Sequence, residues 1–402
     1  MTVANSAPAE GRLLRAGYSD ETREWLARVE KIAPLVEENR ERGDRERVTP
    51  RPVFEALRDA GIPRMWVSRQ LGGGQVSIET GSAVIQALAQ LDPSVAWQMG
   101  VQGAIGRLSD YLPEPTARRL FEEHTGLVVG GVNPSGFAEA TDGGFTLNGE
   151  WAFASGSAHA DWLVCAAWVT EGGEVRRTEA GPELRQLFVR ASDVEIRDTW
   201  HTVGLRATGS NHYRVENVRV PVEYTVAGAE MYRPPAPRAS RAYDISYYDF
   251  GPFTSASTAL GIAQNAVDSF KELAAGKTRT AGSSTLAQSH VVQEKLARAE
   301  FQVYAARVLL LDTARRVQEF GPTGGDPLSA VARLTAATVA EQAVAAVDAA
   351  YDLAGATSVY ETSRLERCFR DVHSAVKHIT LSPTHFEMAG QYLLGGGLQM
   401  RR

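Results

Sequence analysis

The chain lacks the short motifs that identify several common enzyme classes. No GxGxxG follows an expected strand and no P-loop occurs, so neither a Rossmann dinucleotide site nor a nucleoside triphosphate site is indicated. HExxH and GxSxG are also absent, which removes the usual sequence support for a zinc peptidase or an α/β-hydrolase. The eight histidines include no pair four residues apart, the helical spacing that places two ligands on one metal ion. The sequence therefore predicts no metal site.

Cysteine, uninterrupted apolar sequence and excess positive charge are missing as well. The two cysteines, Cys165 and Cys368, are too few and too far apart for a disulfide framework, and we expect buried thiols in a reducing cytosol. No apolar run reaches the ~18 residues that a membrane-spanning helix needs, and the first residues contain no apolar signal segment. The net charge of −6 argues against a nucleic-acid partner. These features predict a cytoplasmic protein that does not bind membranes.

Hydrophobic periodicity divides the 402 residues into three regions. Apolar residues recur at helical spacing in the first part of the chain, and short alternating strands with glycine-rich turns follow without helices between them. Long, alanine-rich helices then return, and helices with such wide apolar faces must pack together in a bundle. The pattern predicts an α+β chain with a flexible tail at 1–18, an N-terminal helical domain at 19–125, a central β-barrel or β-sandwich domain at 126–226, and a C-terminal helical bundle domain at 227–402.

The segment LNGEWAFASGSAHADW, residues 147–162, has the most informative local pattern. Asn148 and Gly149 form an Asn-Gly pair between apolar runs, which predicts a two-residue hairpin turn. Residues 150–154 then alternate as in a half-buried strand, and small residues follow. A strand that ends in small, hydroxyl-bearing residues leaves room for a flat ligand and supplies hydrogen bonds to its edge. An ordinary strand-to-loop transition is the alternative.

Aromatic residues follow a loop rich in proline, arginine and tyrosine at 227–245. Tyr247 and Phe250 come soon after this loop, and we expect them to line a cavity for a planar aromatic substrate. His159 follows the small residues at the end of the predicted strand and is a further candidate for substrate contact.

Four helices are expected in the C-terminal region, over 256–275, 291–319, 328–353 and 365–380. Within the last of these, His373 and His378 are five residues apart and would point roughly 140° away from each other, so that only one of them can face a given pocket. His378 would share its helix face with Asp371 and Ala375.

The order of the three regions, together with four segments, resembles the acyl-CoA dehydrogenase superfamily. The segments are LNGEWAFASGSAHADW (147–162), DTWHTVGLRATGSNHYRVENVRVP (198–221), GKTRTAGSSTLAQSHVVQEKLARAE (276–300) and RCFRDVHSAVKH (367–378). The resemblance extends over nearly the whole chain and implies an acyl-CoA dehydrogenase-like fold with a C-terminal four-helix bundle. It also implies a homotetramer.

Acyl-CoA dehydrogenases remove the α-proton of a thioester with a carboxylate base. The position where many members carry this glutamate falls on Ile379, counted from the Arg-Asp pair at 370–371, and a second position used by some members falls near Gly251. Neither residue is acidic, and without a base the α-proton cannot leave. Asp249 is close enough to the second position that an acyl-CoA dehydrogenase with an atypical base is an alternative.

In lacking an acidic residue at both positions, the sequence resembles the group D, two-component flavin-dependent monooxygenases. Examples are the oxygenase component of 4-hydroxyphenylacetate 3-hydroxylase, phenolic steroid hydroxylase and dibenzothiophene monooxygenase. In that branch a histidine stands one residue before the lost glutamate, as His378 does here. The resemblance implies reduced FMN or FAD supplied by a separate NAD(P)H:flavin reductase, a flavin C4a-hydroperoxide formed with O2, and hydroxylation of an aromatic or polycyclic small molecule. N- or S-oxygenation of an amine, aminosugar or thiophene is the alternative on the same fold, and a non-catalytic flavin-binding scaffold is a third.

The resemblance also carries roles onto individual residues. His378 and Ser155 are the expected catalytic residues, and Ser155 also contacts the flavin edge. Core packing is the alternative for Trp97, and a plain Asn-Pro-Ser turn is the alternative for Asn133 and Ser135. The full set expected at the flavin is Trp97, Asn133, Ser135, Ser155, Thr208, Ser210, Arg279 and Gly355, of which Arg279 and Gly355 would serve the flavin of a neighbouring subunit.

Overall fold

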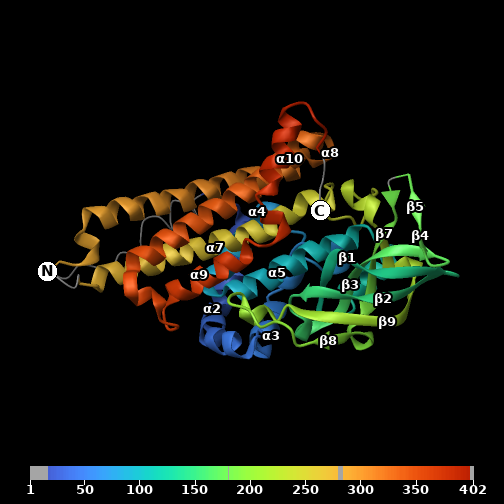
Figure 1. The fold of residues 1–402 in the computed structure, drawn as a ribbon, viewed down its shortest axis with the longest axis horizontal. Helices are drawn as coiled ribbons and strands as arrows, with labels where there is room; N and C mark the ends of the chain where they lie inside the picture. Colours follow the sequence, from blue (N-terminus) through green and yellow to red (C-terminus); the bar gives the residue numbers. More distant parts are fainter. Residues whose placement is uncertain (1–16, 180, 279–283, 399–402) are drawn as a thin grey trace.

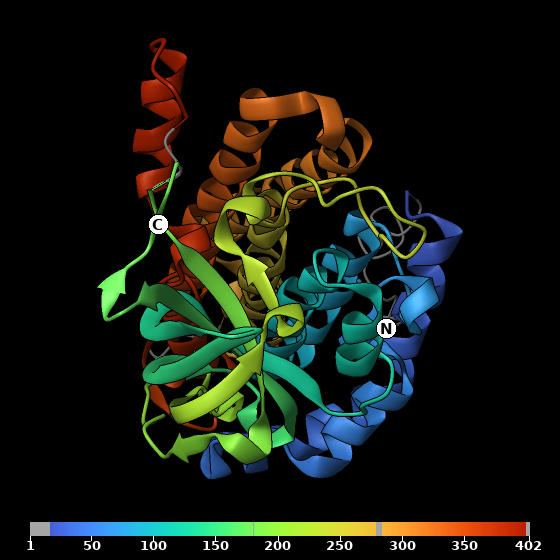
Figure 2. The same ribbon diagram turned by 90° about the vertical axis from the view of Figure 1, so that its right-hand side faces the viewer.

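The computed structural model describes residues 17–179, 181–278 and 284–398, and it has a helical region, a central sheet and a second helical region in that order (Figure 1). The sheet lies at one end of an elongated molecule, and the long C-terminal helices extend to the other end. Seen from the sheet end, the N-terminal helices flank one side of the sheet and the C-terminal bundle stands behind it (Figure 2). The predicted α+β architecture is confirmed, whereas the predicted tail lies almost entirely outside the described residues.

Capping residues start the N-terminal helices at positions that the sequence indicates. The Ser19 hydroxyl accepts a hydrogen bond from the Thr22 N–H at the start of α2. The Asp92 carboxylate accepts from two N–H groups in the first turn of α5, and the first residue of that helix is Pro93. The α-helices of this region are α2 (Asp20–Glu46), α3 (Arg51–Asp59), α4 (Ile78–Leu91), α5 (Pro93–Gly106) and α6 (Glu114–Phe121).

The central region forms one mixed sheet of eight strands. The strand order is β10-β7-β3-β1-β2-β9-β8, and β4 pairs with β3. β1 and β3 run parallel, and the other pairs of this sheet are antiparallel. The strands are β1 (Leu127–Thr141), β2 (Gly144–Ala154), β3 (Ala160–Glu171), β4 (Glu174–Val175), β7 (Leu184–Arg190), β8 (Glu195–Arg197), β9 (Asn211–Pro221) and β10 (Thr225–Ala227), with a separate short pair of β5 (Arg177–Thr178) and β6 (Gly181–Pro182).

The predicted hairpin turn at residues 148–149 is wrong. Both residues lie inside β2, and the chain reverses instead at the Asp-Gly pair 142–143, whose glycine has a left-handed φ of 72°. Gly149 faces Gly136 of β1 across the ladder. A Cβ on Gly149 would lie 2.6 Å from the Gly136 Cα and 2.7 Å from the Trp151 ring. This glycine is therefore needed for close packing within the sheet rather than for a turn.

Among the described residues, α7, the two arms of α8 and α9 correspond to the four helices predicted for the C-terminal bundle. α8 is broken at Gly325, whose φ of 50° and ψ of −149° are not helical, and a hydrogen bond of 3.0 Å between the Thr313 and Thr335 hydroxyls joins its two arms. α7 and α9 pack against each other and against α8. The helices are α7 (Tyr247–Gly276), α8 (His290–Ala354), α9 (Arg364–Ala375) and α10 (Thr384–Leu393), the last of which projects from the body of the molecule (Figure 1).

The second arm of α8 belongs to a long apolar helical segment. By length and composition alone, the segment Thr323–Val359 could cross a membrane. Its apolar window is 61% buried inside the protein, however, and the arm packs within the bundle. This is the burial that a core helix of a folded bundle requires.

α9 ends five residues earlier than predicted. Its last helical residue is Ala375, and the backbone hydrogen bonds tighten to a three-residue spacing at Lys377 and His378. His378 is extended (φ −70°, ψ 140°) and caps a short 3-10 turn over Ile379–Leu381. The prediction that His378 shares a helix face with Asp371 is therefore wrong, because the two residues do not lie on one helix.

Candidate functional site

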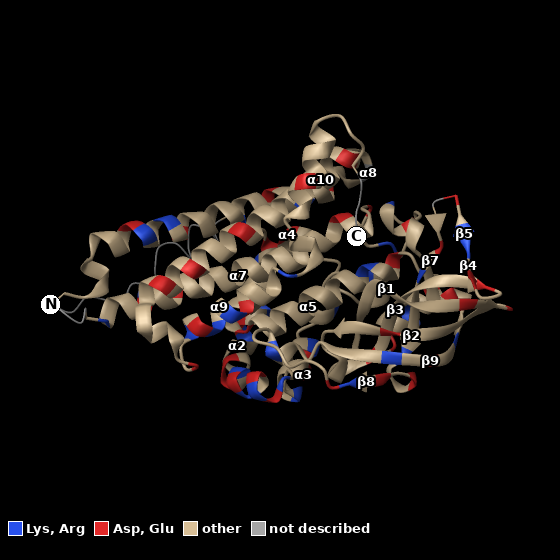
Figure 3. Ribbon diagram, viewed as in Figure 1, with Lys and Arg blue, Asp and Glu red and all other residues tan. Residues whose placement is uncertain are grey.

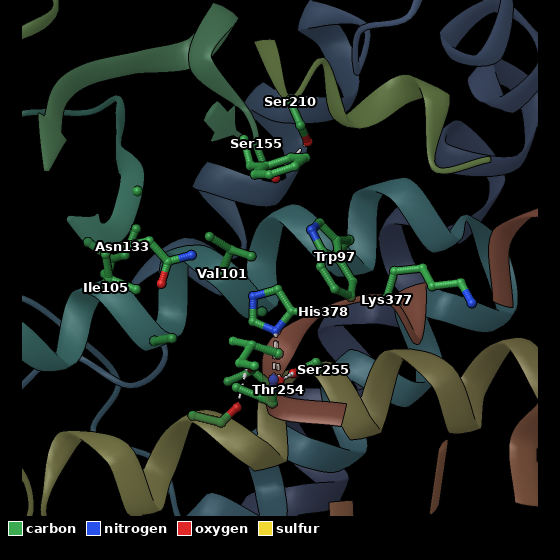
Figure 4. A pocket seen from close by; sticks show the side chains of 18 of the residues that line it. Trp97, Val101, Ile105, Asn133, Ser155, Ser210, Thr254, Ser255, Lys377 and His378 are labelled. Carbon is green, nitrogen blue, oxygen red and sulfur yellow. Dashed lines mark hydrogen bonds between the residues drawn. The ribbon is translucent and has the colours of Figure 1, made fainter. Parts of the chain in front are cut away.

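A cavity of about 510 Å³ lies where the three regions meet. α5 and α7, the facing parts of β1 and β2, and the segment that follows α9 form its walls (Figure 4). Charged residues are spread over the outer helices, whereas α5 contains none (Figure 3). None of the described residues that line the cavity is an aspartate or a glutamate. The volume and the mainly apolar walls are typical of a small-molecule site.

Three buried hydroxyls form a chain on the β side of the cavity. Thr208 Oγ1 donates to the Leu205 carbonyl (2.8 Å), and the Ser210 hydroxyl bonds both Thr208 Oγ1 (2.6 Å) and Ser155 Oγ (2.7 Å). Each hydroxyl has a single proton. Because Thr208 gives its proton to a carbonyl, Ser210 must donate to Thr208, and Ser155 must donate to Ser210. Ser155, which lines the cavity, therefore presents an acceptor oxygen to it.

His378 lies on the helical side of the cavity. Its Nδ1 bonds the Thr380 hydroxyl (2.7 Å), which in turn bonds Ser255 of α7 (2.5 Å). The Trp97 ring meets the imidazole edge-on, with 5.3 Å between ring centroids. Nε2 has no hydrogen-bond partner among the described residues, so this nitrogen is available to a ligand. Figure 4 shows the ring between Trp97 and Thr254, on the opposite side of the cavity from Ser155.

His378 is exposed to the cavity, and the protein atoms that surround the cavity reduce the hydration of its ring. This partial desolvation lowers the pKa of His378 to about 4, because it disfavours the charged form. The ring is therefore neutral at neutral pH. A neutral imidazole can accept the proton of a ligand hydroxyl or hydrogen-bond to it.

Tyrosines form another wall of the cavity. The Tyr232 and Tyr248 rings lie 4.5 Å apart, and Tyr247 meets Tyr248 edge-on at 5.5 Å. Val101 and Ile105 of α5 also line the cavity. Aromatic and branched apolar side chains of this kind suit a flat, aromatic ligand.

Asp249 is not among the residues that line the cavity. Its carboxylate accepts hydrogen bonds from the Ser246 hydroxyl (2.7 Å), the Ser329 hydroxyl (2.6 Å) and the Arg333 guanidinium (3.0 Å). These bonds hold it in the contact between α7 and α8. Within the described ranges, no group of three histidine, cysteine, aspartate or glutamate side chains could hold a metal ion.

Most of the residues predicted at the site do line the cavity. Thr208 stands one layer behind, bonded to Ser210. Their contacts with a flavin or a substrate stay predictions. The lining residues of the predicted set are Trp97, Asn133, Ser135, Ser155, Ser210, Tyr247 and His378.

Two predicted substrate contacts are corrected by the structure. Phe250 is fully buried and meets Trp66 edge-on (5.1 Å), because successive helix residues point about 100° apart and Gly251 faces the cavity instead. His159 Nε2 bonds the Thr49 carbonyl (2.7 Å), which ties the sheet to the N-terminal helices. Neither Phe250 nor His159 lines the cavity.

Two residues, Arg279 and Gly355, were predicted to serve a neighbouring subunit's flavin. Gly355 ends α8 with a left-handed φ of 59° and does not line the cavity. Arg279 lies outside the described residues.

The sequence analysis missed several lining residues. Gly251, Ser255 and Thr258 follow Tyr247 at intervals of three or four residues along α7, so helical periodicity of small residues was a usable signal. Lys377 also lines the cavity, but its position depends on where α9 ends, and no local pattern marks that point.

Comparisons with known proteins place this geometry in a family. Residues 18–111 match the family model described as "Acyl-CoA dehydrogenase, N-terminal domain", and residues 253–383 match "Acyl-CoA dehydrogenase, C-terminal domain". The chain is 28% identical over 362 residues to the indole-3-acetate monooxygenase of Pseudomonas putida, covering 88% of this chain and 89% of that protein. It is 29% identical over 389 residues to the oxygenase component of the FADH(2)-dependent resorcinol hydroxylase of Rhizobium sp. (strain MTP-10005), covering 92% and 94%.

The fold is shared with solved structures. XiaF from Streptomyces sp., described in complex with FADH2 and glycerol, superimposes with a TM-score of 0.88 at 24% sequence identity. The match covers 96% of this chain and 99% of that one.

Proposed function

Because the chain belongs to the acyl-CoA dehydrogenase-like superfamily and, within it, to the oxygenase components of two-component flavin-dependent monooxygenases, we propose that it hydroxylates an aromatic small molecule with reduced FMN or FAD and O2. A separate NAD(P)H:flavin reductase supplies the reduced flavin. The tyrosine wall of the cavity supports an aromatic substrate. So do the names of the relatives, which refer to indole-3-acetate and resorcinol.

The β side of the cavity fits a reduced flavin. A reduced isoalloxazine has an N–H on its central edge, and the hydroxyl chain leaves Ser155 as an acceptor for such a group. We assign Ser155, Ser210, Trp97, Asn133 and Ser135 to holding the ring. When bound, the flavin activates O2 and supplies the oxygen atom that is transferred.

We assign His378 the role of hydrogen-bonding, from Nε2, the oxygen of a substrate hydroxyl, because Nδ1 accepts the Thr380 N–H and the single ring proton is then on Nε2. Thr380, which is itself bonded to Ser255, bonds Nδ1 and thereby orients the ring. The lowered pKa keeps the imidazole neutral at neutral pH, so that it carries one N–H and no charge. The apolar walls around it limit the access of water to the reacting groups.

One observation carries this proposal: the cavity contains an imidazole and no carboxylate among its described lining residues. Ile379 and Gly251, which occupy the two positions of the dehydrogenase base, both line the cavity and are not acidic. Asp249 is bonded to Arg333 and Ser329 instead. Removal of an α-proton from a thioester therefore has no carboxylate base here.

Labelled oxygen tests the proposal directly. The protein is supplied with reduced FMN or FAD by a flavin reductase under ¹⁸O2, with indole-3-acetate, resorcinol or p-hydroxyphenylacetate as the trial substrate. We expect one ¹⁸O atom in the product of at least one of them. The matched test for the alternative adds an acyl-CoA to the protein loaded with oxidised FAD. Bleaching of the flavin by acyl-CoA, without any ¹⁸O incorporation, would show a dehydrogenase instead.

We also propose that the chain forms a homotetramer through α8. Phe301, Tyr304 and Val308 lie on one face of its first arm and are 67%, 45% and 48% exposed, and such a stripe is typical of a protein interface. The resemblance assigns Arg279 and Gly355 to the flavin of such a neighbouring subunit. Light scattering during size-exclusion chromatography should show a smaller species for Phe301→Asp, and an unchanged mass would refute this interface.

A further inference from the structure

A tight turn of the β-domain, residues 203–205, is docked on α9 of the C-terminal bundle. The buried Asp371 carboxylate accepts a hydrogen bond from the Leu205 N–H (2.6 Å), and the Arg370 guanidinium donates to the Val203 carbonyl (2.6 Å). Arg370 and Asp371 are the Arg-Asp pair of the late helix in the sequence analysis, and the proposed chemistry gives them no role.

Gly204 sits between these two bonds with no room for a side chain. A Cβ at this position would lie 2.3 Å from the Arg370 carbonyl oxygen and 2.6 Å from Ser374 Oγ. Its φ is not left-handed, so the requirement for glycine here is steric. The turn is therefore seated directly on the backbone of α9.

Leu205 connects this docking to the cavity. It lines the cavity and has a left-handed conformation (φ 51°, ψ 35°) that a leucine seldom adopts. Its carbonyl accepts hydrogen bonds from Trp200 Nε1 (3.0 Å) and from Thr208 Oγ1 (2.8 Å), the first member of the hydroxyl chain that ends at Ser155. The Thr208 N–H also donates to this carbonyl (3.1 Å). A strained residue persists only where surrounding bonds fix it, and the bond from the Leu205 N–H to Asp371 is one of the four that do so here.

The same helix leads to His378. α9 ends at Ala375, three residues before His378, so the position of the imidazole follows the position of this helix. α9 thus positions both sides of the cavity. It holds the β side through its bond to Leu205, and it positions the helical side because the chain runs directly from its end to His378.

We propose that Asp371 is a positioning residue that, by holding Leu205, sets the spacing between the Ser155 hydroxyl chain and His378. The inference rests on the proposed function, since it assumes that a flavin lies beside one group and a substrate beside the other.

The Asp371 carboxylate that holds Leu205 is ionised at neutral pH. Burial raises the pKa of Asp371 to about 6, still below neutral pH, because Arg367 and the Leu205 N–H favour the charged form. Arg367 Nε lies 3.5 Å from the second carboxylate oxygen. A hydrogen bond to an ionised acceptor is stronger than one between neutral groups, which suits a group that must hold a strained residue.

Three variants separate positioning from charge and from folding. Asp371→Ala removes the acceptor, and Gly204→Ala pushes the turn off α9 without changing any charge. Asp371→Asn keeps an acceptor oxygen for Leu205 but removes the charge. Gly390→Ala in α10 is the matched control for the glycine change, because a methyl group there would meet no other atom within 4 Å.

Two measurements report position rather than stability. One is the visible circular dichroism of the protein saturated with oxidised FMN or FAD, and the other is the amount of product formed per O2 consumed. We expect Asp371→Ala and Gly204→Ala to lose most of the flavin dichroism and to lower the product yield per O2 by about tenfold or more. Asp371→Asn should restore most of both values, and Gly390→Ala should match the wild type.

Wild-type dichroism and yield in Asp371→Ala or in Gly204→Ala would overturn the inference. So would an Asp371→Asn variant as impaired as Asp371→Ala, since the charge beside Arg367 would then explain the effect. If Asp371→Ala does not fold, Gly204→Ala and Asp371→Asn decide the matter. If the wild type oxygenates no trial substrate, the proposed function fails, while the flavin dichroism still tests the positioning role.

Discussion

The two walls of the cavity are built by different means. The β wall presents Ser155 and Ser210 at the points where β2 ends and β9 begins, beside the paired residues Ala154 and Asn211. Its hydroxyls bond one another, and strand pairing fixes the backbone that carries them. The helical wall presents His378 from a short turn beyond the end of α9, held at Nδ1 by Thr380.

The two walls also differ in how their polar groups respond to pH. The β wall offers hydroxyls that do not titrate near neutral pH, whereas the helical wall contains a group whose proton affinity depends on its hydration. Under the proposed function, the rigid wall serves the flavin, which every turnover requires, and the helical wall serves the substrate. Changes in the two walls should therefore have separable consequences.

Loss of the imidazole from the helical wall should have the largest effect. His378→Ala removes the hydrogen bond of the imidazole to the substrate, and we expect oxygenation to fall about 100-fold or more, the usual contribution of a positioned hydrogen-bond donor at a reacting centre. Flavin affinity should not change, because the β wall is intact. Product yield and flavin titration measure the two quantities. His373→Ala is the control, since His373 bonds Asp348 (2.9 Å) and does not line the cavity. An unimpaired His378→Ala would remove the distinction between the walls.

Added volume inside the sheet should disturb the β wall as a unit. The methyl group of Gly149→Ala would press on Gly136 and on the Trp151 ring, and we expect a loss of about 1–3 kcal/mol in the free energy of unfolding. Urea unfolding measures it. Gly276→Ala is the control, because a methyl group at the end of α7 meets nothing within 4 Å. Equal stability of the two variants would contradict the close packing described for the sheet.

Removal of one hydroxyl from the β wall should weaken flavin binding more modestly. Ser155→Ala deletes the acceptor that faces the cavity, so reduced FMN or FAD should bind about tenfold more weakly, the order of one hydrogen bond. Oxidised flavin, which lacks the N–H, should be affected less. Anaerobic and aerobic titrations compare the two forms. Ser157→Ala is the control, since its hydroxyl donates to the Gly209 carbonyl (3.3 Å) outside the cavity lining. Equal losses for both forms of flavin would contradict the direction assigned to the hydroxyl chain.

The β wall was more predictable from the sequence than the helical wall. Small hydroxyl-bearing residues at the end of an alternating segment identified Ser155, and a local pattern sufficed because the strand and its end are adjacent in the chain. Strand register was not predictable. Two Asx-Gly pairs, at 142–143 and 148–149, compete for the turn, and pairing with the rest of the sheet decides between them.

The residues of the helical wall depend on where helices begin and end, and the local sequence specifies helix ends poorly. α7 begins at Tyr247, nine residues before its predicted start, so the phase that places Gly251 rather than Phe250 at the cavity could not be deduced. His378 was identified only by resemblance, and the helical geometry expected around it was wrong.

The smallest expected effect concerns the acid side of the stability profile, and it should arise from the helical wall alone. In the unfolded chain a histidine has a pKa of about 6.5, whereas partial desolvation lowers the pKa of His378 to about 4 in the folded protein. Between these two pKa values, the histidine is protonated in the unfolded chain and unprotonated in the folded protein. The contribution of this group to stability is therefore complete above about pH 6.5 and is lost as the pH falls towards 4.

His378→Asn removes this titration, so its Tm should fall less than that of the wild type between pH 7 and pH 4.5. Burial also lowers the pKa of His159 and of His385, so these residues keep part of the acid sensitivity in the variant, and only the difference between the two curves belongs to His378. Ser155→Ala should follow the wild-type curve, because the β wall contributes no group that titrates in this range. Parallel curves for His378→Asn and the wild type would mean that the ring is as well hydrated in the native protein as in the unfolded chain, and the neutral imidazole assigned to the helical wall would lose its physical basis.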